Sequence, residues 1–195
     1  MDIFINDERV NFKLKEKQVG PMIEEIQEYL SKEGKVLAEL KINGVKIANE
    51  QVEISGAIYL VEIKSRTHRE LVIESLYYLE KYADKFFDIL DSPTDEIDAN
   101  QLYDMIGFIE WCLGVLYSMK EVTNIPFIYS DFDEYLNDFK NSTDELIDSF
   151  KAGDYERVME ILEMEVISYI QDFEANGPDY LKEIMDEEAR KNLLN

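Results

Sequence analysis

The feature that most constrains the fold is a change in the spacing of apolar residues near Thr67. Before it, apolar and polar side chains alternate in short runs, which is typical of half-buried strands. After it, apolar residues recur at intervals of three and four, as on one face of a helix. They are Val72, Leu76, Leu79, Ala83, Phe86 and Leu90. The chain is therefore expected to be α+β, with a sheet first and helices afterwards.

The first 64 residues predict five strands and one helix. The run "DIFINDERVNFKL" predicts a hairpin, and Pro21 opens an amphipathic helix that Gly34 is placed to end. The runs "VLAELKI", "VKIA" and "AIYLVEIK" predict three more strands. Asn43-Gly44 predicts a type I′ turn, because both turn positions need positive φ. A right-handed crossover is expected to place the third strand beside the first, in parallel.

Such a mixed sheet with one helix across a face is the β-grasp arrangement. The blocks "IFINDERV", "INGVKIANEQ" and "ISGAIYLVEI" resemble the strand blocks of ubiquitin-like sulfur-carrier proteins, those of thiamine and molybdopterin biosynthesis in particular. The resemblance covers the first third of the chain and implies a β-grasp surface that binds other proteins. Sulfur carriers end in a reactive Gly-Gly tail, whereas here "EIKSRTHREL" leads into a helix. The resemblance therefore does not imply carrier chemistry.

Residues 65–195 predict an acidic up-down bundle of four or five helices. Ser92-Pro93 is expected to start the second helix, and Ser130 or Asp131 the third, which either continues or breaks at 141–143. Asp154 is expected to cap the next helix, and Asn176-Gly177-Pro178 to end it before a short last helix. We therefore predict two domains, a β-grasp-like domain over 1–64 and an acidic helical bundle over 65–195.

The charge is distributed unevenly along the chain. Residues 1–64 carry 12 acidic and 9 basic side chains, and residues 65–195 carry 31 and 11, within a total net charge of −23. Nucleic acid is excluded as a direct ligand, because phosphate binding needs Lys and Arg to release counterions. An anionic membrane is disfavoured for the same reason. A basic protein partner is favoured, although a charged face can also serve solubility alone.

The same composition predicts a cytoplasmic protein without a cofactor. No run approaches the ~18 consecutive apolar residues of a membrane span, and the N-terminus does not have the pattern of a signal peptide. The one cysteine, Cys112, has apolar neighbours and predicts a buried structural thiol. The oligomeric state is not readable from the sequence.

No catalytic motif is present, so the sequence predicts that the chain is not an enzyme. The one histidine, His68, predicts a surface or interface position, since a single histidine forms neither a triad nor a histidine-containing metal set. Glu110 lies among apolar residues, where burial would raise the pKa of its carboxyl group, but a polar helix face explains it too. Acids at 156, 160, 163 and 165 lack the Glu-x-x-His pattern of di-iron bundles. Catalytic and metal residues are therefore predicted as none.

Aromatic residues supply the candidate partner contacts. Adjacent residues lie 100° apart on a helix, so each pair of neighbouring rings leaves one ring away from the core. Together with the apolar stretch 125–129, which either tucks under the bundle or meets a partner, this predicts six surface contacts. They are Tyr77, Tyr78, Tyr82, Phe87, Phe127 and Tyr129.

The function expected from the sequence is non-enzymatic protein–protein interaction, as an adaptor or regulatory subunit in a bacterial cytoplasm. Its two contact surfaces would be the β-grasp sheet and the acidic bundle. The alternative is an acidic chaperone or nucleic-acid mimic that shields a basic partner, which predicts binding that weakens steeply with salt. A third class, a metal protein or enzyme centred on Glu110 and the acids of 156–165, predicts stoichiometric metal.

Overall fold

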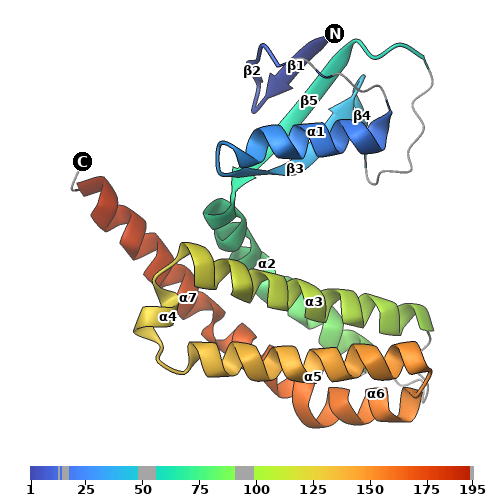
Figure 1. Cartoon of the computed structure of the whole chain (residues 1–195). Coiled ribbons are helices and arrows are strands. Elements are labelled where there is room, and N and C mark those ends of the chain that lie inside the picture. Colours follow the sequence, from blue (N-terminus) through green and yellow to red (C-terminus); the bar gives the residue numbers. More distant parts are fainter. Residues whose placement is uncertain (13, 15–17, 48–55, 91–98, 194–195) are drawn as a thin grey trace. The chain divides into compact units, whose positions relative to one another are not determined.

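The structure is a computed structural model of the whole chain, and it describes residues 1–12, 14, 18–47, 56–90 and 99–193 (Figure 1). The chain divides into two compact units, Met1–Leu71 and Val72–Asn195. We call them the sheet unit and the helical unit and describe each by itself. The expected α+β class, with a mixed sheet and one helix followed by a helical region, is confirmed. The predicted domain boundary after residue 64 stays a prediction.

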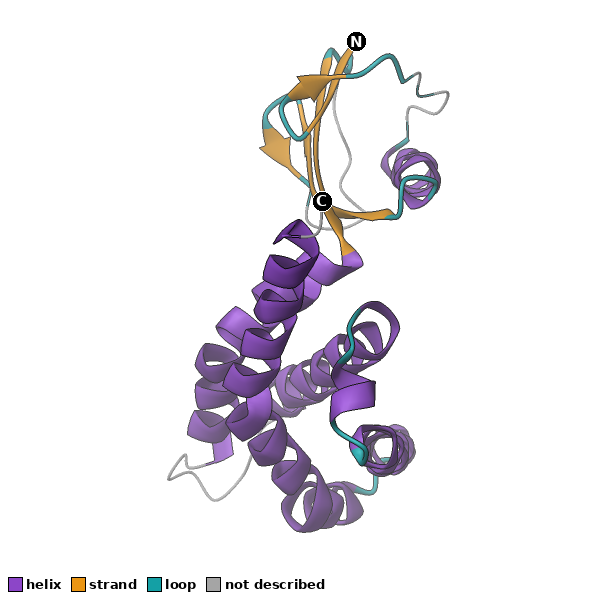
Figure 2. Ribbon diagram, turned by 90° about the vertical axis from the view of Figure 1, so that its left-hand side faces the viewer, coloured by secondary structure: helices purple, strands orange, loops and turns teal. Residues whose placement is uncertain are grey.

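The sheet unit contains one mixed sheet of five strands in the order β2-β1-β5-β3-β4, with the helix α1 against one face. Figure 2 shows α1 beside the sheet. The elements are β1 (Asp2–Ile5), β2 (Glu8–Arg9), α1 (Val19–Ser31), β3 (Lys35–Ile42), β4 (Val45–Lys46) and β5 (Leu60–Thr67).

The parallel neighbour of β1 is β5, so the prediction that the third strand lies beside the first was wrong. β1 pairs with β5 in parallel, and β3 pairs with β5 antiparallel. The crossover through α1 leaves a gap one strand wide between β1 and β3, and β5 fills it with hydrogen bonds to both sides. The central strand of the sheet is therefore the last one in the sequence.

Two asparagines that make the hairpin turns also hold β5 in place. Asn43 and Gly44 have φ of 53° and 81°, which confirms the turn with two positive φ values. The Asn43 side-chain amide donates to the Ala57 carbonyl at 3.0 Å, just before β5, and its oxygen accepts from the N–H of Leu60, the first residue of β5, at 3.1 Å. Asn6, in the first turn, accepts from the Ser65 N–H at 2.9 Å. Each turn therefore fixes the register of the central strand.

The core of the sheet unit lies between α1 and the sheet. Met22, Ile26 and Leu30, one stripe of α1, are completely buried. They pack against alternate residues of the strands, which point to the same face of the sheet. Those strand residues are Ile3, Ile5, Leu40, Ile42, Val61 and Ile63.

The strand β5 leads directly into the first long helix, α2 (His68–Leu90), through a capping box. The Thr67 hydroxyl accepts from the Glu70 N–H at 3.1 Å, and the Glu70 carboxylate accepts from the Thr67 N–H at 2.7 Å. Both bonds satisfy backbone donors that the start of a helix leaves without partners. The run "THRE" is thus a helix start.

The helical unit contains the rest of α2 and the helices that follow it. They are α3 (Ala99–Val122), α4 (Ile125–Ile128), α5 (Phe132–Ala152), α6 (Tyr155–Ile161), the π-helical segment η1 (Leu162–Val166) and α7 (Ile167–Leu193). Asp154 caps α6, as predicted, by accepting from the Arg157 N–H at 3.1 Å. Ser92-Pro93, the predicted start of α3, lies outside the described residues.

One predicted boundary was wrong, and an open one is decided. α5 is continuous through residues 141–143, where the sequence left a break open, and α7 continues through Asn176, Gly177 and Pro178, where a helix end was predicted. Tertiary packing explains the wrong prediction: a Cβ on Gly177 would lie 2.9 Å from Leu79 Cδ2 of α2. The glycine thus permits close approach between two helices instead of ending one.

A single apolar core fills the helical unit. It includes fully buried Phe139, Leu116 and Ile109, and α5 packs beside α3 (Figure 1). Among the described residues, one helical stretch, Asn100–Val122, is long and apolar enough to cross a membrane by length and composition. Half of its most apolar 18-residue stretch is buried inside the unit.

Candidate interaction surface

Seven aromatic rings on α2 and α3 form a continuous chain of ring contacts, which we call the aromatic ladder. Four of the six predicted contact residues belong to it: Tyr77, Tyr78, Tyr82 and Phe87. The other three rings, which the sequence reasoning missed as contacts, are Phe86, Phe108 and Trp111.

The ladder is held together by edge-to-face and stacked pairs. Tyr82 meets Trp111 edge-on with centroids 5.4 Å apart, and Trp111 stacks on Phe108 at 5.7 Å. Phe108 then contacts Phe86 at 5.3 Å. Such pairs are worth about 0.5–1.5 kcal/mol beyond burial of area, so the exposed rings are held by the rings below them.

The ladder runs from the surface into the core. Tyr77 is 72% exposed, Tyr78 and Tyr82 are about 40% exposed, and Phe86 is buried. A pocket of about 280 Å³ opens beside its middle, lined by Tyr82, Phe86 and Phe108 with Lys85, Ile89, Asp104 and Met105. Lys85 Nζ lies 5.9 Å from the centre of the Tyr82 ring, within the range of a cation–π contact.

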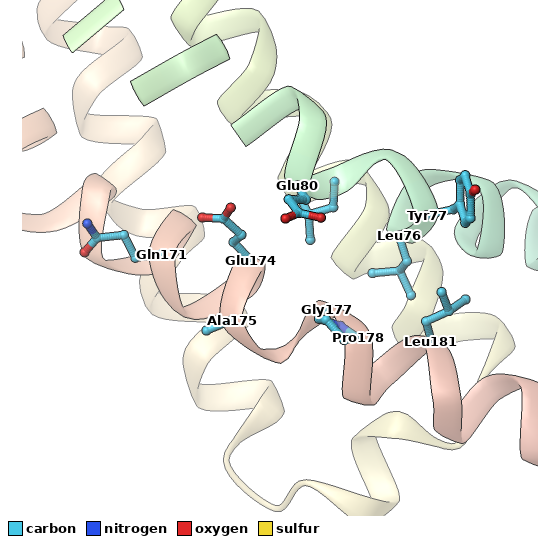
Figure 3. Close-up of a pocket in the computed structure, with 10 residues that line it drawn as sticks. Leu76, Tyr77, Glu80, Gln171, Glu174, Ala175, Gly177, Pro178 and Leu181 are labelled. Atoms are coloured by element: carbon cyan, nitrogen blue, oxygen red, sulfur yellow. The ribbon is translucent and has the colours of Figure 1, made fainter. Parts of the chain in front are cut away.

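A larger groove lies between α2 and α7 and begins at the exposed end of the ladder. Its volume is about 530 Å³, and Tyr77 belongs to both features. The carboxylates of Glu80 and Glu174 point toward each other across the groove (Figure 3). The lining residues are Leu76, Tyr77, Leu79, Glu80, Gln171, Glu174, Ala175, Gly177, Pro178 and Leu181.

The surroundings of the groove raise the pKa of one of its carboxyl groups, that of Glu174. Partial burial raises the pKa of the Glu174 carboxyl above its usual value, and the negative charges of Asp84 and Glu80 raise it further. Bringing a cation to this position would relieve the repulsion among the three acids.

The two remaining predicted contacts, Phe127 and Tyr129, lie away from the ladder, on and after α4. Phe127 is 88% exposed, whereas Ile125 is buried. Tyr129 is partly buried and contacts the Tyr180 ring edge-on at 5.0 Å. Burial, with the nearby Asp179 and Glu183, raises the pKa of Tyr129. The stretch 125–129 therefore tucks in at Ile125 and Tyr129 and exposes Phe127.

The candidate metal and catalytic residues do not converge on one site. Glu110 is exposed on α3. Glu160 pairs with Arg157 at 2.5 Å, and Glu165 accepts from the Ser142 hydroxyl at 2.6 Å. Among the residues that the structure describes, no three His, Cys, Asp or Glu side chains are placed to hold a metal ion.

The histidine and the cysteine occupy ordinary positions. His68, the first residue of α2, is exposed. Cys112 is fully buried, and burial raises the pKa of its thiol, so the reactive thiolate is disfavoured.

Comparison with protein families finds a matching family model in each part of the chain. The model of a family described as a domain of unknown function, DUF8042, matches residues 70–176, more than half of the chain. The chain belongs to the DUF8042 family. The DUF8042 match includes the whole aromatic ladder and the α2 wall of the groove, and it ends at Asn176, just before the Gly177-Pro178 pair of α7.

A second family model, the TP0873 N-terminal domain, matches residues 1–59. This match includes β1 to β4 and α1 and ends one residue before β5. The searches of curated proteins and of solved structures each found no match.

Proposed function

We propose that the chain is a non-enzymatic protein-interaction module, an adaptor or regulatory subunit of a bacterial cytoplasm, whose helical unit binds a partner protein through the aromatic ladder. The ladder is the observation that carries this proposal. It presents three tyrosines, at 77, 78 and 82, at the surface. The rings of Trp111, Phe108 and Phe86 below hold them in position.

This arrangement suits an interface for two physical reasons. Tyr and Trp provide large contact areas with a polar edge, and they dominate the binding energy of many interfaces. Rings that are already fixed by their neighbours lose little side-chain entropy on binding, so more of the contact energy remains as affinity.

The charge of the helical unit favours a basic partner. Residues 72–195 carry 30 acidic and 9 basic side chains, a net charge of −21 (9 − 30). That field repels nucleic acid and anionic membranes, and it accelerates encounters with a positively charged protein. The same surplus of acids is the observation that favours the alternative, an acidic chaperone or nucleic-acid mimic.

The sheet unit offers a second contact surface. The face away from α1 carries a row of neighbouring residues across the strands, namely Arg9, Phe4, Glu62, Lys41 and Lys46. Its charged side chains are three basic and one acidic, which suits a polar contact that fixes register more than it adds affinity. The resemblance to sulfur carriers, which use such a sheet for protein binding, supports this part of the proposal.

The test is site-specific photo-crosslinking in an extract of the source cells. A crosslinking amino acid replaces Tyr78 in one sample and Tyr117 in the other, because both tyrosines are 40% exposed and Tyr117 belongs to no described ring pair of the ladder. We expect one discrete protein to be captured at residue 78 and not at 117, and then to bind the purified chain. Equal capture at both residues would contradict the proposal.

Salt separates the proposal from its alternative. Docking on aromatic rings buries apolar area, which salt does not screen, so we expect most of the affinity to remain in concentrated salt. The affinity of a purely charge-shielding chaperone would fall steeply between low and high salt.

A further inference from the structure

The α2–α7 groove combines an apolar end with an anionic end. Leu76 and Leu181 lie toward one end, and Glu80 and Glu174 toward the other (Figure 3). Leu76 and Glu80 are one turn apart on α2, so about 5–6 Å of helix rise separates the two ends. A fitting ligand therefore carries an apolar group and a cation at about that separation.

Pro178 adds a third acceptor to the anionic end. Proline has no N–H, so the carbonyl of Glu174, four residues earlier in α7, lacks its usual helical donor. Residues four apart lie on the same face of a helix, and both of these residues line the groove. A lysine ammonium or an arginine guanidinium has enough donors for this carbonyl and the two carboxylates together.

The described residues that line the groove supply no compensating positive charge. Among the described residues that line it, two are carboxylic acids and none is lysine or arginine. Asp84, one turn beyond Glu80 on α2, acts on Glu174 as well. The missing cation must therefore come from the ligand.

We infer that the groove binds a basic amphipathic segment of the partner protein, one that places a leucine-like side chain between Leu76 and Leu181 and a lysine or arginine between Glu80 and Glu174. This inference rests on the proposed function and names the chemistry of the segment bound. A second copy of the chain is disfavoured as the occupant, because two units of charge −21 repel each other.

Two labelled synthetic peptides test the inference against the full chain. The first is a short amphipathic helix in which each leucine is followed one turn later by lysine, and the second has glutamine in place of every lysine. Fluorescence anisotropy is measured at physiological salt, where distant surface charges are screened beyond about 8 Å. We expect the lysine peptide to bind and the glutamine peptide to bind at least roughly tenfold more weakly.

A matched pair of double variants separates the groove from the general acidity of the surface. Glu80→Gln with Glu174→Gln removes two charges from the groove, and Glu110→Gln with Glu121→Gln removes two from exposed positions of α3. We expect the first pair to weaken binding of the lysine peptide roughly tenfold and the second less than about twofold. Equal weakening by both pairs would show attraction to the acidic surface in general and overturn the inference.

A variant that fills the groove tests its apolar end. Ala175 is an exposed lining residue, so Ala175→Phe occupies the groove without entering the core. We expect it to abolish binding of the lysine peptide while the circular dichroism spectrum is unchanged. Full binding by this variant would overturn the inference, and so would a free polyamine that binds as tightly as the peptide.

The experiments distinguish failure of the groove inference from failure of the proposed function. A partner captured at residue 78, together with no binding of the lysine peptide, overturns the groove and leaves the interaction module in place. No capture at residue 78, together with selective peptide binding in the groove, overturns the ladder as the interface and leaves the groove as a binding site.

Discussion

The two units differ in where their polar groups find partners. In the sheet unit, Glu39 pairs with Lys41 and Lys46, Asp2 with Arg9, and the turn asparagines with the central strand. In the helical unit, 30 acidic side chains face only 9 basic ones, so the charges of the unit are far from balanced. The difference teaches that the sheet unit nearly balances its own charge, whereas the helical unit carries a large surplus of negative charge.

The largest expected effects come from truncating one buried side chain in each unit, which tests whether both cores are tightly packed. Phe139→Ala in the helical unit is expected to lower the free energy of unfolding by about 3–5 kcal/mol, and Ile63→Ala in the sheet unit by about 2–5 kcal/mol, because both side chains are buried. Urea titration followed by Trp111 fluorescence measures the first, and hydrogen exchange of the β5 amides measures the second. A loss below about 1 kcal/mol at either site would mean that the unit is loosely packed.

Pro178→Ala tests whether Pro178, which lines the groove, lowers the stability of the helical unit. The substitution restores a backbone donor for the Glu174 carbonyl, so we expect the free energy of unfolding to rise by about 1–3 kcal/mol. We also expect the lysine peptide to bind more weakly, because one acceptor is lost.

The matched control is Pro126→Ala, at the start of α4, where proline replaces no helical hydrogen bond. It is expected to change stability by less than about 0.5 kcal/mol. If Pro178→Ala were destabilising, the proline would be a packing element, and the contrast between the units would weaken.

Two glycines of the helical unit, one in open space and one packed against Leu79, are expected to respond differently to substitution by alanine. A Cβ on Gly107, exposed on α3, meets nothing within 4 Å, so Gly107→Ala is expected to stabilise by about 0.5–1 kcal/mol through helix propensity. Gly177→Ala gains the same propensity but must displace Leu79, which offsets the gain. Thermal melting should show a Tm increase of about 2–4 °C for the first and none for the second. Equal increases would show that the approach of α7 to α2 is loose.

The smallest expected effect is an opposite pH dependence of two glutamates. Hydrogen bonds from Lys46 and Lys41 lower the pKa of Glu39 from 4.5 to about 2, so its stabilisation is present above pH 4.5 and is lost as the pH falls toward 2. The raised pKa of Glu174 means that its charge destabilises the folded state above that pKa, and that acid relieves the effect.

Replacing each glutamate by glutamine measures what its charge contributes to stability. Glu39→Gln is expected to lower Tm at neutral pH and to flatten its fall in acid. Glu174→Gln is expected to raise Tm at neutral pH by about 1–2 °C, since solvent screening keeps the contribution of a partly buried group at the surface near 0.5 kcal/mol. Shifts of the same sign would remove the electrostatic contrast between the units.

Local sequence signals predicted the sheet unit well, with one topological exception. Asn43-Gly44 specifies its turn because few other residue pairs accept two positive φ values. The predicted parallel neighbour of β1 was β3, and the observed one is β5. Strand order depends on which strand fills the gap that a crossover leaves. Hydrogen-bonding partners on both sides of β5 come from residues about 20 to 60 positions away.

In the helical unit, tertiary packing overrode one of the local sequence signals and formed contacts that those signals do not predict. Apolar spacing predicted which residues form its core, and Cys112 is buried as expected. The breaker signals at Gly177-Pro178 were misleading, because packing against Leu79 outweighed the local preference for a turn. The exposed tyrosines were found from their paired spacing, but Phe108 and Trp111 were missed as contacts because the ladder crosses from one helix to another.

The sequence by itself determined the α+β class, the acidic charge of the helical part, the type I′ turn and the cap at Asp154, because each depends on residues close together in the chain. Tertiary structure alone decided that β5 is the central strand and that residues 76–80 and 171–181 enclose one groove. Those features arise from contacts between distant segments, whose free energy is set by packing and not by local preference.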